Sequence, residues 1–320
     1  MALYLGIDTS NYTTSVAITD DKQNLIADKR LLLNVKTGGL GLRQSEAVFQ
    51  HIKNFPLLFA NLFDKVDKKS INTIGVSVKP RPEENSYMPV FLVGLTIAQV
   101  LAKTLDIPLI ETTHQEGHLM AGIWSCGQKL IRDFNAIHIS GGTTEVLKVS
   151  LKEYRPVKFF IDKIGGTSDL HAGQFIDRVG VKMGLSFPAG PQLEELAQKS
   201  IKPCIFPISV NNLNFSFSGP ESHAQRLISK GENYSDIARG VENCLINTLE
   251  KLIINVYDKN NLKYFLFVGG VARNKYIRTT LKERLENTTD LKLLFADPVF
   301  SSDNAVGASL IAKTGHGGVY

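Results

Sequence analysis

Two histidines, His114 and His118, are the side chains of this 320-residue sequence whose types and spacing best suit chemistry. Residues four apart share one face of a helix, so both imidazoles can bind the same metal ion. A strand-like apolar run at 107–110 precedes them, and the pair is therefore expected where a helix follows the carboxyl end of a strand. Open α/β sheets bind their ligands at that edge. The alternative is a pair of solvated histidines on a helix surface.

Two glycine turns are suited to the phosphates of a nucleotide. Ser140, Gly141 and Gly142, followed by two threonines, form a turn whose backbone N–H groups no large side chain covers, which favours an anion. Gly-Gly alone is also a common hairpin turn. The run 269–274, Gly-Gly-Val-Ala-Arg-Asn, ends a buried strand and opens a helix, where bare backbone can approach a nucleotide. It lacks the spacing of a dinucleotide motif and the lysine of a P-loop.

A carboxylate near the end of the chain, Asp303, stands where the pattern predicts a helix N-terminus. It is either a functional group or an N-cap, which is the commonest use of aspartate at this position. An irregular loop at 79–89, with three prolines and mixed charge, is either functional or a rigid connector.

The apolar spacing predicts alternating strands and helices around these residues. Strands are expected at 3–8, 14–19, about 24–33, 73–78 and 263–268. Helices are expected at 45–63, at 88–102 as a buried helix, at 173–185, from about 192, and at 235–256. Residues 122–133 are expected to link two lobes.

Two stretches about 130 residues apart resemble each other. Residues 4–18 and 135–149 both read as a strand, a small polar turn, two threonines and a second strand. Such a repeat predicts a duplicated α/β domain that faces itself across a cleft. Over so few residues, a chance resemblance between two hairpins is the alternative.

The composition limits the class of protein. With 43% hydrophobic residues, the chain can form two lobes with cores of their own. The net charge of +5 permits an acidic partner such as nucleic acid or nucleotide without demanding one. Three widely spaced cysteines indicate neither a disulfide framework nor a zinc ribbon and fit a reducing cytosol. The N-terminus has no signal-peptide pattern, and no apolar run is long enough to span a bilayer.

Taken in order, five stretches resemble a known family. They are His-x-Glu-Gly-His at 114–118, Ser-Gly-Gly-Thr-Thr at 140–144, GQFIDR at 173–178 with FPAGP at 187–191, NFSFSG at 214–219, and GGVARN at 269–274 with SSDNA at 301–305. Over most of the chain, this order is similar to TsaD and its archaeal and eukaryotic counterpart in the KEOPS complex, a family that has also carried a glycoprotease label. The resemblance implies an α/β, two-lobed fold of the actin, heat-shock chaperone and sugar-kinase (ASKHA) type, with duplicated domains around a nucleotide cleft.

The same resemblance implies an activity. Family members transfer a threonylcarbamoyl group from its adenylate to the exocyclic amine of an adenosine beside the tRNA anticodon, with the help of one divalent metal, iron or zinc. By resemblance, His114, His118 and Asp303 are the metal ligands. Some members add a tyrosine where this chain has His138, and we propose this imidazole as a fourth ligand. A strand histidine without metal is the alternative for His138.

A nucleotide, either ATP or an acyl-adenylate, with or without Mg²⁺, is implied for a second group of residues. The resemblance places Ser140, Gly141 and Gly142 at the phosphate or carbamoyl end, Asp177 at the ribose hydroxyls, Gly190 beside the sugar, and Asn274 near the base or phosphates.

The organisation and the partners also follow from the resemblance. Residues 1–125 are expected to form the lobe with the histidine pair, 126–300 the lobe with the glycine turns, and 301–320 a helix that returns to the first lobe. The expected partners are tRNA or another amine acceptor, proteins similar to TsaB and TsaE, and a second copy in a dimer. A cytoplasmic location without membrane contact is expected.

Several family positions differ, mostly near the acyl acceptor. The first hairpin lacks the acidic residues that usually follow its Thr-Ser, although Asp8 remains. The glycine turn has Thr143 where the family has histidine, and the 169–178 stretch lacks one acid of a pair and a glutamate. The loop at 79–89 replaces a glycine-rich one. These differences predict a divergent paralogue, a metal- and ATP-dependent threonylcarbamoyl or carbamoyl transferase whose acceptor could differ from tRNA.

Three other functions stay open. A small-molecule kinase of the same superfamily would bind Mg-ATP through acidic groups and would need no histidine cluster. A catalytically silent paralogue would keep metal and nucleotide as a scaffold. A zinc protease is disfavoured, because its glutamate directly follows the first histidine, whereas Glu116 sits two residues from each histidine, about 200° around the helix.

Overall fold

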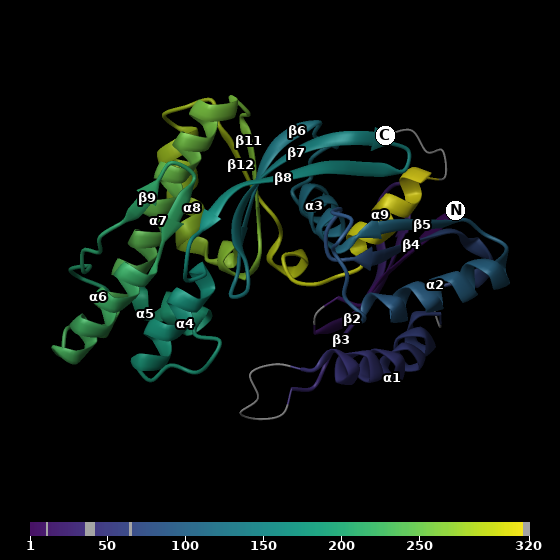
Figure 1. Cartoon of the computed structure of the whole chain (residues 1–320), viewed down its shortest axis with the longest axis horizontal. Helices are drawn as coiled ribbons and strands as arrows, with labels where there is room; N and C mark the ends of the chain where they lie inside the picture. The colour runs from purple at the N-terminus through teal and green to yellow at the C-terminus, as the bar shows by residue number, and fades with distance from the viewer. Residues whose placement is uncertain (11, 36–41, 64–65, 316–320) are drawn as a thin grey trace. The chain divides into compact units, whose positions relative to one another are not determined.

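The protein divides into two compact units, each with a hydrophobic core of its own. The computed structural model in Figure 1 describes residues 1–10, 12–35, 42–63 and 66–315. The first unit consists of Met1–Arg132, Ser150–Phe160 and Ser302–Tyr320. The second unit consists of Asp133–Val149 and Ile161–Ser301.

In the first unit, a five-stranded sheet has the order β3-β2-β1-β4-β5. β1 pairs with β2, and β2 with β3, in antiparallel fashion, whereas β1–β4 and β4–β5 are parallel. The central strand β1 is buried along its whole length, which agrees with its nearly continuous apolar sequence. The strands are β1 Leu3–Asp8, β2 Thr13–Asp20, β3 Leu25–Leu32, β4 Ile71–Lys79 and β5 Leu109–Thr113.

Helices cover both faces of this sheet. Successive residues of β1 point to opposite sides, and all of them are buried, so each side must be covered. Gly6 faces α9, the yellow helix of Figure 1, and Ile7 faces α2. α3 also packs against α9. The helices of the unit are α1 Gln44–Leu62, the short 3-10 helix η1 Lys68–Ser70, α2 Phe91–Leu105, α3 His114–Ser125 and α9 Val306–Gly315.

The second unit contains most of a seven-stranded sheet with the order β12-β11-β6-β7-β8-β10-β9. The strands are β6 Asp133–Ile139, β7 Thr144–Tyr154, β8 Val157–Thr167, β9 Ser209–Asn211, β10 Asn214–Ser216, β11 Tyr264–Val268 and β12 Lys292–Phe295. The helices are α4 Ala172–Lys182, α5 Gly190–Ala197, α6 Ser218–Ser229, α7 Tyr234–Asn260, η2 Gly270–Arg273, α8 Lys275–Glu286 and η3 Pro298–Phe300. The ends of β7 and β8 that are joined by their turn, residues 150–160, group with the first unit.

The predicted duplication is visible in the strand order. β8-β7-β6-β11-β12 in the second sheet repeats β3-β2-β1-β4-β5 in the first. The parallel pairs correspond as well, since β6–β11 and β11–β12 match β1–β4 and β4–β5. A chance resemblance of two hairpins would not extend to five strands, so the repeat is structural.

Two sequence-based expectations were wrong in detail. The 122–133 segment is not a linker throughout, because α3 continues to Ser125 and its capping residue is Cys126. The apolar helix predicted at 88–102 is α2, but it is not fully buried, since Leu92 and Val100 are exposed. A helix that covers one face of a sheet buries only one stripe of its surface, however apolar its sequence. In the first hairpin turn, Asn11 lies outside the described residues.

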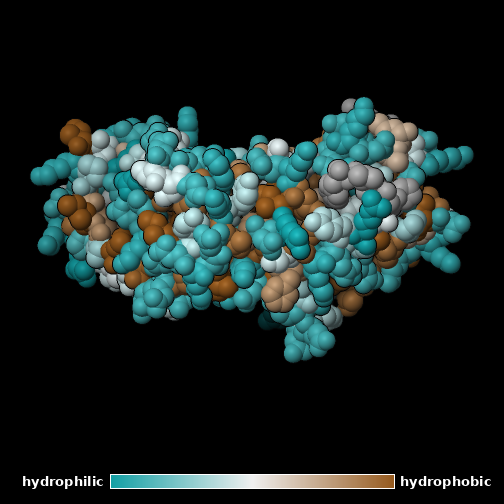
Figure 2. Space-filling model, turned by 90° about the horizontal axis from the view of Figure 1, so that it is seen from above, coloured by the Kyte–Doolittle hydropathy of each residue, from teal (hydrophilic) through white to brown (hydrophobic). Residues whose placement is uncertain are grey.

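The surface carries scattered rather than merged hydrophobic side chains on the face in Figure 2, where brown groups are separated by teal polar ones. Among the described residues, no helix combines the length and the apolar character that crossing a bilayer requires.

Candidate metal centre and nucleotide pocket

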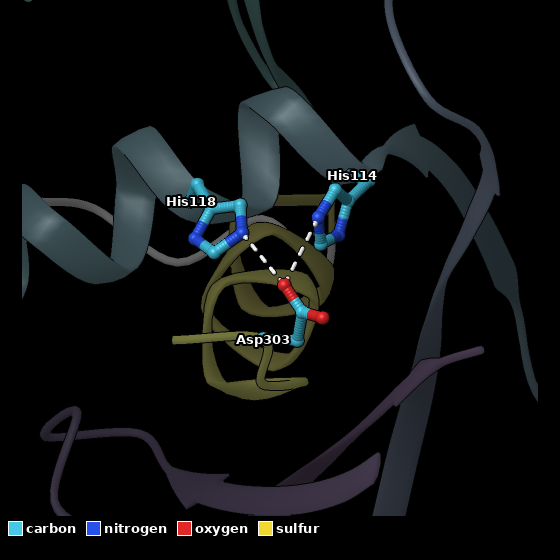
Figure 3. Close-up of side chains that lie close together, drawn as sticks. All are labelled: His114, His118 and Asp303. Carbon is cyan, nitrogen blue, oxygen red and sulfur yellow. Dashed lines mark ion pairs between the residues drawn. The ribbon is translucent and has the colours of Figure 1, made fainter. Parts of the chain in front are cut away.

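Three predicted ligands, His114, His118 and Asp303, converge in the first unit (Figure 3). Their ligand atoms all lie within 4.8 Å of one another. Asp303 Oδ1 is 3.5 Å from His114 Nε2 and 3.4 Å from His118 Nε2. The two rings meet edge to face with centroids 4.3 Å apart. The four-residue spacing places the two imidazoles side by side. The fold then brings to them a carboxylate that stands 185 positions beyond His118 in the chain.

The histidine helix begins without any intervening loop, since β5 ends at Thr113 and α3 begins at His114. A capping box fixes this start: the Thr113 hydroxyl accepts from Glu116 N at 3.2 Å, and the Glu116 carboxylate accepts from Thr113 N at 3.0 Å. The same carboxylate also accepts from the Thr112 hydroxyl and from Phe159 N. Glu116 is buried and both of its carboxylate oxygens accept hydrogen bonds, so the single acidic residue of the motif holds the start of the helix in place.

The glycine between the two histidines lies where α3 and α9 meet. A Cβ atom on Gly307 would come within 1.9 Å of the Gly117 carbonyl oxygen, so the two helices touch through backbone atoms. Asp303 lies four residues before Gly307, and both histidines flank Gly117. This close contact sets the separation between the carboxylate and the imidazoles.

Asp303 does not act as the N-cap of the following helix. The side-chain oxygen of Asn304 accepts from Val306 N at 2.9 Å, and its amide donates to the Ser302 carbonyl. Arg30 donates to the Ser302 hydroxyl at 3.2 Å. Because its neighbours organise the turn, the Asp303 carboxylate is left to face the histidines, and the N-cap alternative is wrong.

Burial and charge oppose each other at the histidines. Burial lowers the pKa of His114, but the carboxylates of Asp8 and Asp303 outweigh it and raise the pKa to about 10. Burial raises the pKa of Asp303, but hydrogen bonds and charge from His114 and His118 hold it well below its usual range. A bound cation would replace a proton as the partner of Asp303.

The donor set fits a divalent transition metal. Two imidazole nitrogens and one carboxylate oxygen are the ligands that iron and zinc take, and three protein ligands leave coordination positions for a substrate. His138, the proposed fourth ligand, lies on β6 in the second unit, and its role stays a prediction.

The residues predicted to bind nucleotide lie in the second unit. A pocket of about 460 Å³ is lined by the predicted Gly141, Asp177, Gly190 and Asn274. It is also lined by Gly173, Ile176, Pro188, Pro191, Leu193, Glu194, Gly270, Val271, Arg273 and Pro298. Its volume lies within the range of small-molecule sites. Ser140 and Gly142 are not among its lining residues.

The glycine turn partly satisfies its own amides. The Ser140 hydroxyl accepts from Gly142 N at 3.3 Å and from Thr143 N at 3.0 Å. Among the described residues, no reported hydrogen bond uses Gly141 N. Gly141 is therefore the residue of this turn that both lines the pocket and keeps its N–H outside the hydrogen bonds of the Ser140 hydroxyl.

Two polar side chains of the pocket differ in how many of their polar atoms hydrogen-bond within the protein. Asp177 Oδ1 accepts from Ala189 N at 2.7 Å, and burial raises the pKa of this carboxyl. Asn274 caps α8 by accepting from Ile277 N, and its amide donates to Glu242 at 2.7 Å. Asp177 can therefore accept ligand hydroxyls, whereas Asn274 is mainly held by the protein.

The proline-rich loop after β4 closes on itself and on the histidine helix. The Lys79 ammonium donates to the carbonyls of Pro82 and Glu83, and the Pro80 carbonyl accepts from Gln115 N at 3.0 Å. The loop thus satisfies one of the amides that a helix N-terminus leaves without a partner. These contacts support the connector alternative for the loop.

Known proteins resemble this chain in sequence and in fold. The family model described as "TsaD: tRNA N6-adenosine threonylcarbamoyltransferase" matches residues 33–309. A tRNA N6-adenosine threonylcarbamoyltransferase of Archaeoglobus fulgidus is 31% identical over 97% of this chain and 90% of its own length. The chain belongs to the TsaD family.

Solved structures place the TsaD-family chain in a wider fold group. Component A of the Acidaminococcus fermentans (R)-2-hydroxyglutaryl-CoA dehydratase matches with a TM-score of 0.56 at 16% identity and covers 99% of both chains. A ROK family glucokinase from Streptomyces griseus matches with a TM-score of 0.54 at 11% identity, over 98% of this chain and all of the other. The fold is therefore the predicted two-sheet α/β fold of the ASKHA type.

Sequence reasoning did not identify some residues that shape these TsaD-family sites. Asp8 contacts His114, Gly307 contacts α3, and a Cβ on Gly173 would come within 2.6 Å of Gly141 N. A glycine within the first helical turn costs stability relative to alanine, so Gly173 and Gly307 carried a signal that something else requires them. The sequence analysis noted Asp8 only as the acid that remains in the first hairpin, and nothing local in the sequence pointed to its contact with His114.

Proposed function

We propose that this chain is a metal- and ATP-dependent transferase that moves a threonylcarbamoyl or carbamoyl group from its adenylate to the exocyclic amine of the adenosine beside the tRNA anticodon. The observation that carries the proposal is the triad of His114, His118 and Asp303 in a chain of the TsaD family. The proposal includes a cytoplasmic location, proteins similar to TsaB and TsaE as partners, and a dimer.

The transfer is chemically balanced without a protein nucleophile. The acceptor amine attacks the carbonyl carbon of the mixed anhydride, a C–N bond forms, the C–O bond to the phosphate breaks, AMP leaves and the amine loses a proton. A divalent iron or zinc ion held by the triad would polarise the carbonyl and neutralise the leaving group.

The pocket of the second unit is suited to the adenylate. The proposal assigns the ribose hydroxyls to the Asp177 carboxylate, the phosphate to Gly141 N, and the sugar to the open space beside Gly190. Amides that point at a phosphate also stabilise charge that develops on it as the bond breaks.

The structure offers less support to the rival functions. A protease base must reach a metal-bound water, but the Glu116 carboxylate is buried and accepts from Thr112, Thr113 and Phe159. A kinase would not require the triad. A silent scaffold would keep the triad and the pocket, so it differs from the proposed enzyme only in turnover.

Metal content and tRNA modification test the proposal. Purified protein is expected to retain iron or zinc in elemental analysis, and the double variant His114→Ala/His118→Ala is expected to lose it while keeping its folded spectrum. Cells that lack the protein are expected to lose threonylcarbamoyladenosine from their tRNA nucleosides in mass spectrometry.

The outcomes separate the alternatives. Full metal content in the double variant would show that the triad is not the site. ATP turnover without tight transition metal would favour a kinase, and metal without turnover or any change in tRNA would favour a scaffold. Cleavage of polypeptides without nucleotide would favour a protease.

A further inference from the structure

The imidazole of His114 has a carboxylate on each side. Its Nε2 faces Asp303 at 3.5 Å, and its Nδ1 lies 3.0 Å from Asp8 Oδ2. We propose that Asp8 is a positioning residue for the metal centre, which holds the Nδ1–H of His114 and so presents Nε2 to the ion. This inference rests on the proposed metal site.

Asp8 is fixed firmly enough for such a role. It ends β1, the central strand of its sheet, and only 1% of it is exposed. Its Oδ1 accepts from Ser10 N at 2.8 Å, and its carbonyl accepts from the Ser15 hydroxyl at 3.1 Å. Each carboxylate oxygen therefore has a defined task, one towards its own turn and the other towards His114.

The same arrangement explains why Asp8 orients a ligand rather than binding the metal itself. Asp8 is not part of the group of three residues whose ligand atoms converge. Its contact is with the far nitrogen of the ring, whereas Asp303 faces the near one. Neutral imidazole has one N–H, so a carboxylate at Nδ1 selects the tautomer whose lone pair is on Nε2.

The expected size of the effect comes from the general behaviour of such partners. A carboxylate that accepts from the outer nitrogen of a metal-bound histidine fixes the ring and strengthens it as a ligand, and its loss typically weakens metal binding about 10- to 100-fold. The Phe91 ring lies near His114, with the ring centroids 6.3 Å apart, but it has no carboxylate that could take the place of Asp8.

The test compares Asp8→Asn with a matched control, Asp20→Asn. Asp20 is also a buried carboxylate of the same sheet, and in the described part of the chain its hydrogen bonds from Lys22 N, Asn24 N and the Asn24 amide hold its own turn rather than a histidine. Zinc affinity is measured by competition with a chromophoric chelator, and the melting temperature of the metal-free protein is measured alongside. Asp8→Asn should bind zinc about 10- to 100-fold more weakly, whereas Asp20→Asn should keep wild-type affinity whatever its stability.

A second measurement uses the wild-type protein and so does not depend on how the variants fold. Long-range ¹H–¹⁵N spectra of the zinc-loaded protein should show His114 with a protonated Nδ1 and a metal-bound Nε2. Metal on Nδ1, wild-type affinity in Asp8→Asn, or equal loss of affinity in both variants would overturn the inference. If wild-type protein binds no zinc at all, the proposed metal site fails instead, which is a distinct result.

Discussion

Three glycines that pack against α9 or α3 in the first unit differ in their surroundings from two glycines that line the pocket of the second unit. In the first unit, Cβ atoms on Gly6, Gly75 and Gly307 would come within 2.1, 2.1 and 1.9 Å of backbone oxygens. In the second unit, Cβ atoms on Gly190 and Gly270, which line the pocket, would meet no atom within 4 Å. The first set is required by the packing of the protein, whereas the second leaves space that the protein does not fill.

This difference suggests two ways of building a site. Gly6 and Gly75 pack against α9. Gly307 belongs to α9 and packs against Gly117 of α3. The three candidate metal ligands are therefore held at their separation by the packing of the fold. Gly190 and Gly270 contribute nothing comparable to packing, unlike Gly173 of the same pocket, and we infer that they leave room for a ligand.

The largest effect is expected from Gly307→Ala, which tests whether the packing of α9 against α3 holds the candidate ligands in place. Its Cβ would press against the Gly117 carbonyl, so α9 must move away and carry Asp303 with it. The apparent melting temperature should fall by about 5 °C or more. Zinc binding should weaken about tenfold for every 1.4 kcal/mol of strain at the ligands. Thermal unfolding without metal and zinc competition measure the two effects separately.

Gly117→Ala is the control for this prediction, because it changes the other partner of the same contact. A Cβ on Gly117 would lie 3.9 Å from Ala308 N, which is an ordinary contact. Alanine is also the better helix former by about 1 kcal/mol. This variant should keep its stability and its zinc affinity, and equal damage from both substitutions would contradict the packing argument.

A smaller effect, on binding alone, is expected from Gly190→Val. The new side chain would enter the open space of the pocket, so affinity for a non-hydrolysable ATP analogue should fall about tenfold or more, a loss of about 1.4 kcal/mol. The melting temperature should stay within about 2 °C of wild type, because no neighbour is displaced. Isothermal titration calorimetry measures the affinity.

Gly219→Val provides the matched control for the pocket. Gly219 also lies at the start of a helix with no atom within 4 Å of its Cβ position, but it does not line the pocket. If both valine variants weaken nucleotide binding equally, the loss comes from helix starts in general and the distinction between the two glycine sets is lost.

Much of this arrangement was predictable from local patterns. The runs at 3–8 and 14–19 and the repeat at 135–149 gave strands and a duplication, because apolar periodicity and turn residues act over short distances. The triad was predictable in part, since the four-residue spacing of His114 and His118 places both rings on one helix face. Asp303 joined them through the family resemblance.

What could not be predicted depends on packing between distant segments. The contact of Asp8 with His114 joins residues 106 positions apart, and Gly117 and Gly307 lie still farther apart in sequence. The capture of two turn amides by Ser140 was hidden for a different reason: a serine hydroxyl has several local acceptors and donors, and only the folded turn selects among them. The exposed face of α2 likewise depends on which elements cover it.

The smallest expected effect concerns a buried acid behind the pocket. Burial raises the pKa of Glu242 to about 7, although Asn274 and Arg239 favour its charged form. Its unfolded pKa is near 4.5, so the folded chain binds more protons between pH 4.5 and 7, and stability from this group falls as pH rises through that window. Glu242→Gln should therefore flatten the decline in melting temperature between pH 5 and 7 without changing zinc affinity. A variant with the wild-type pH slope would show that protonation of Glu242 adds nothing to the stability of the second unit. The difference between the two units would then be supported by the glycines alone.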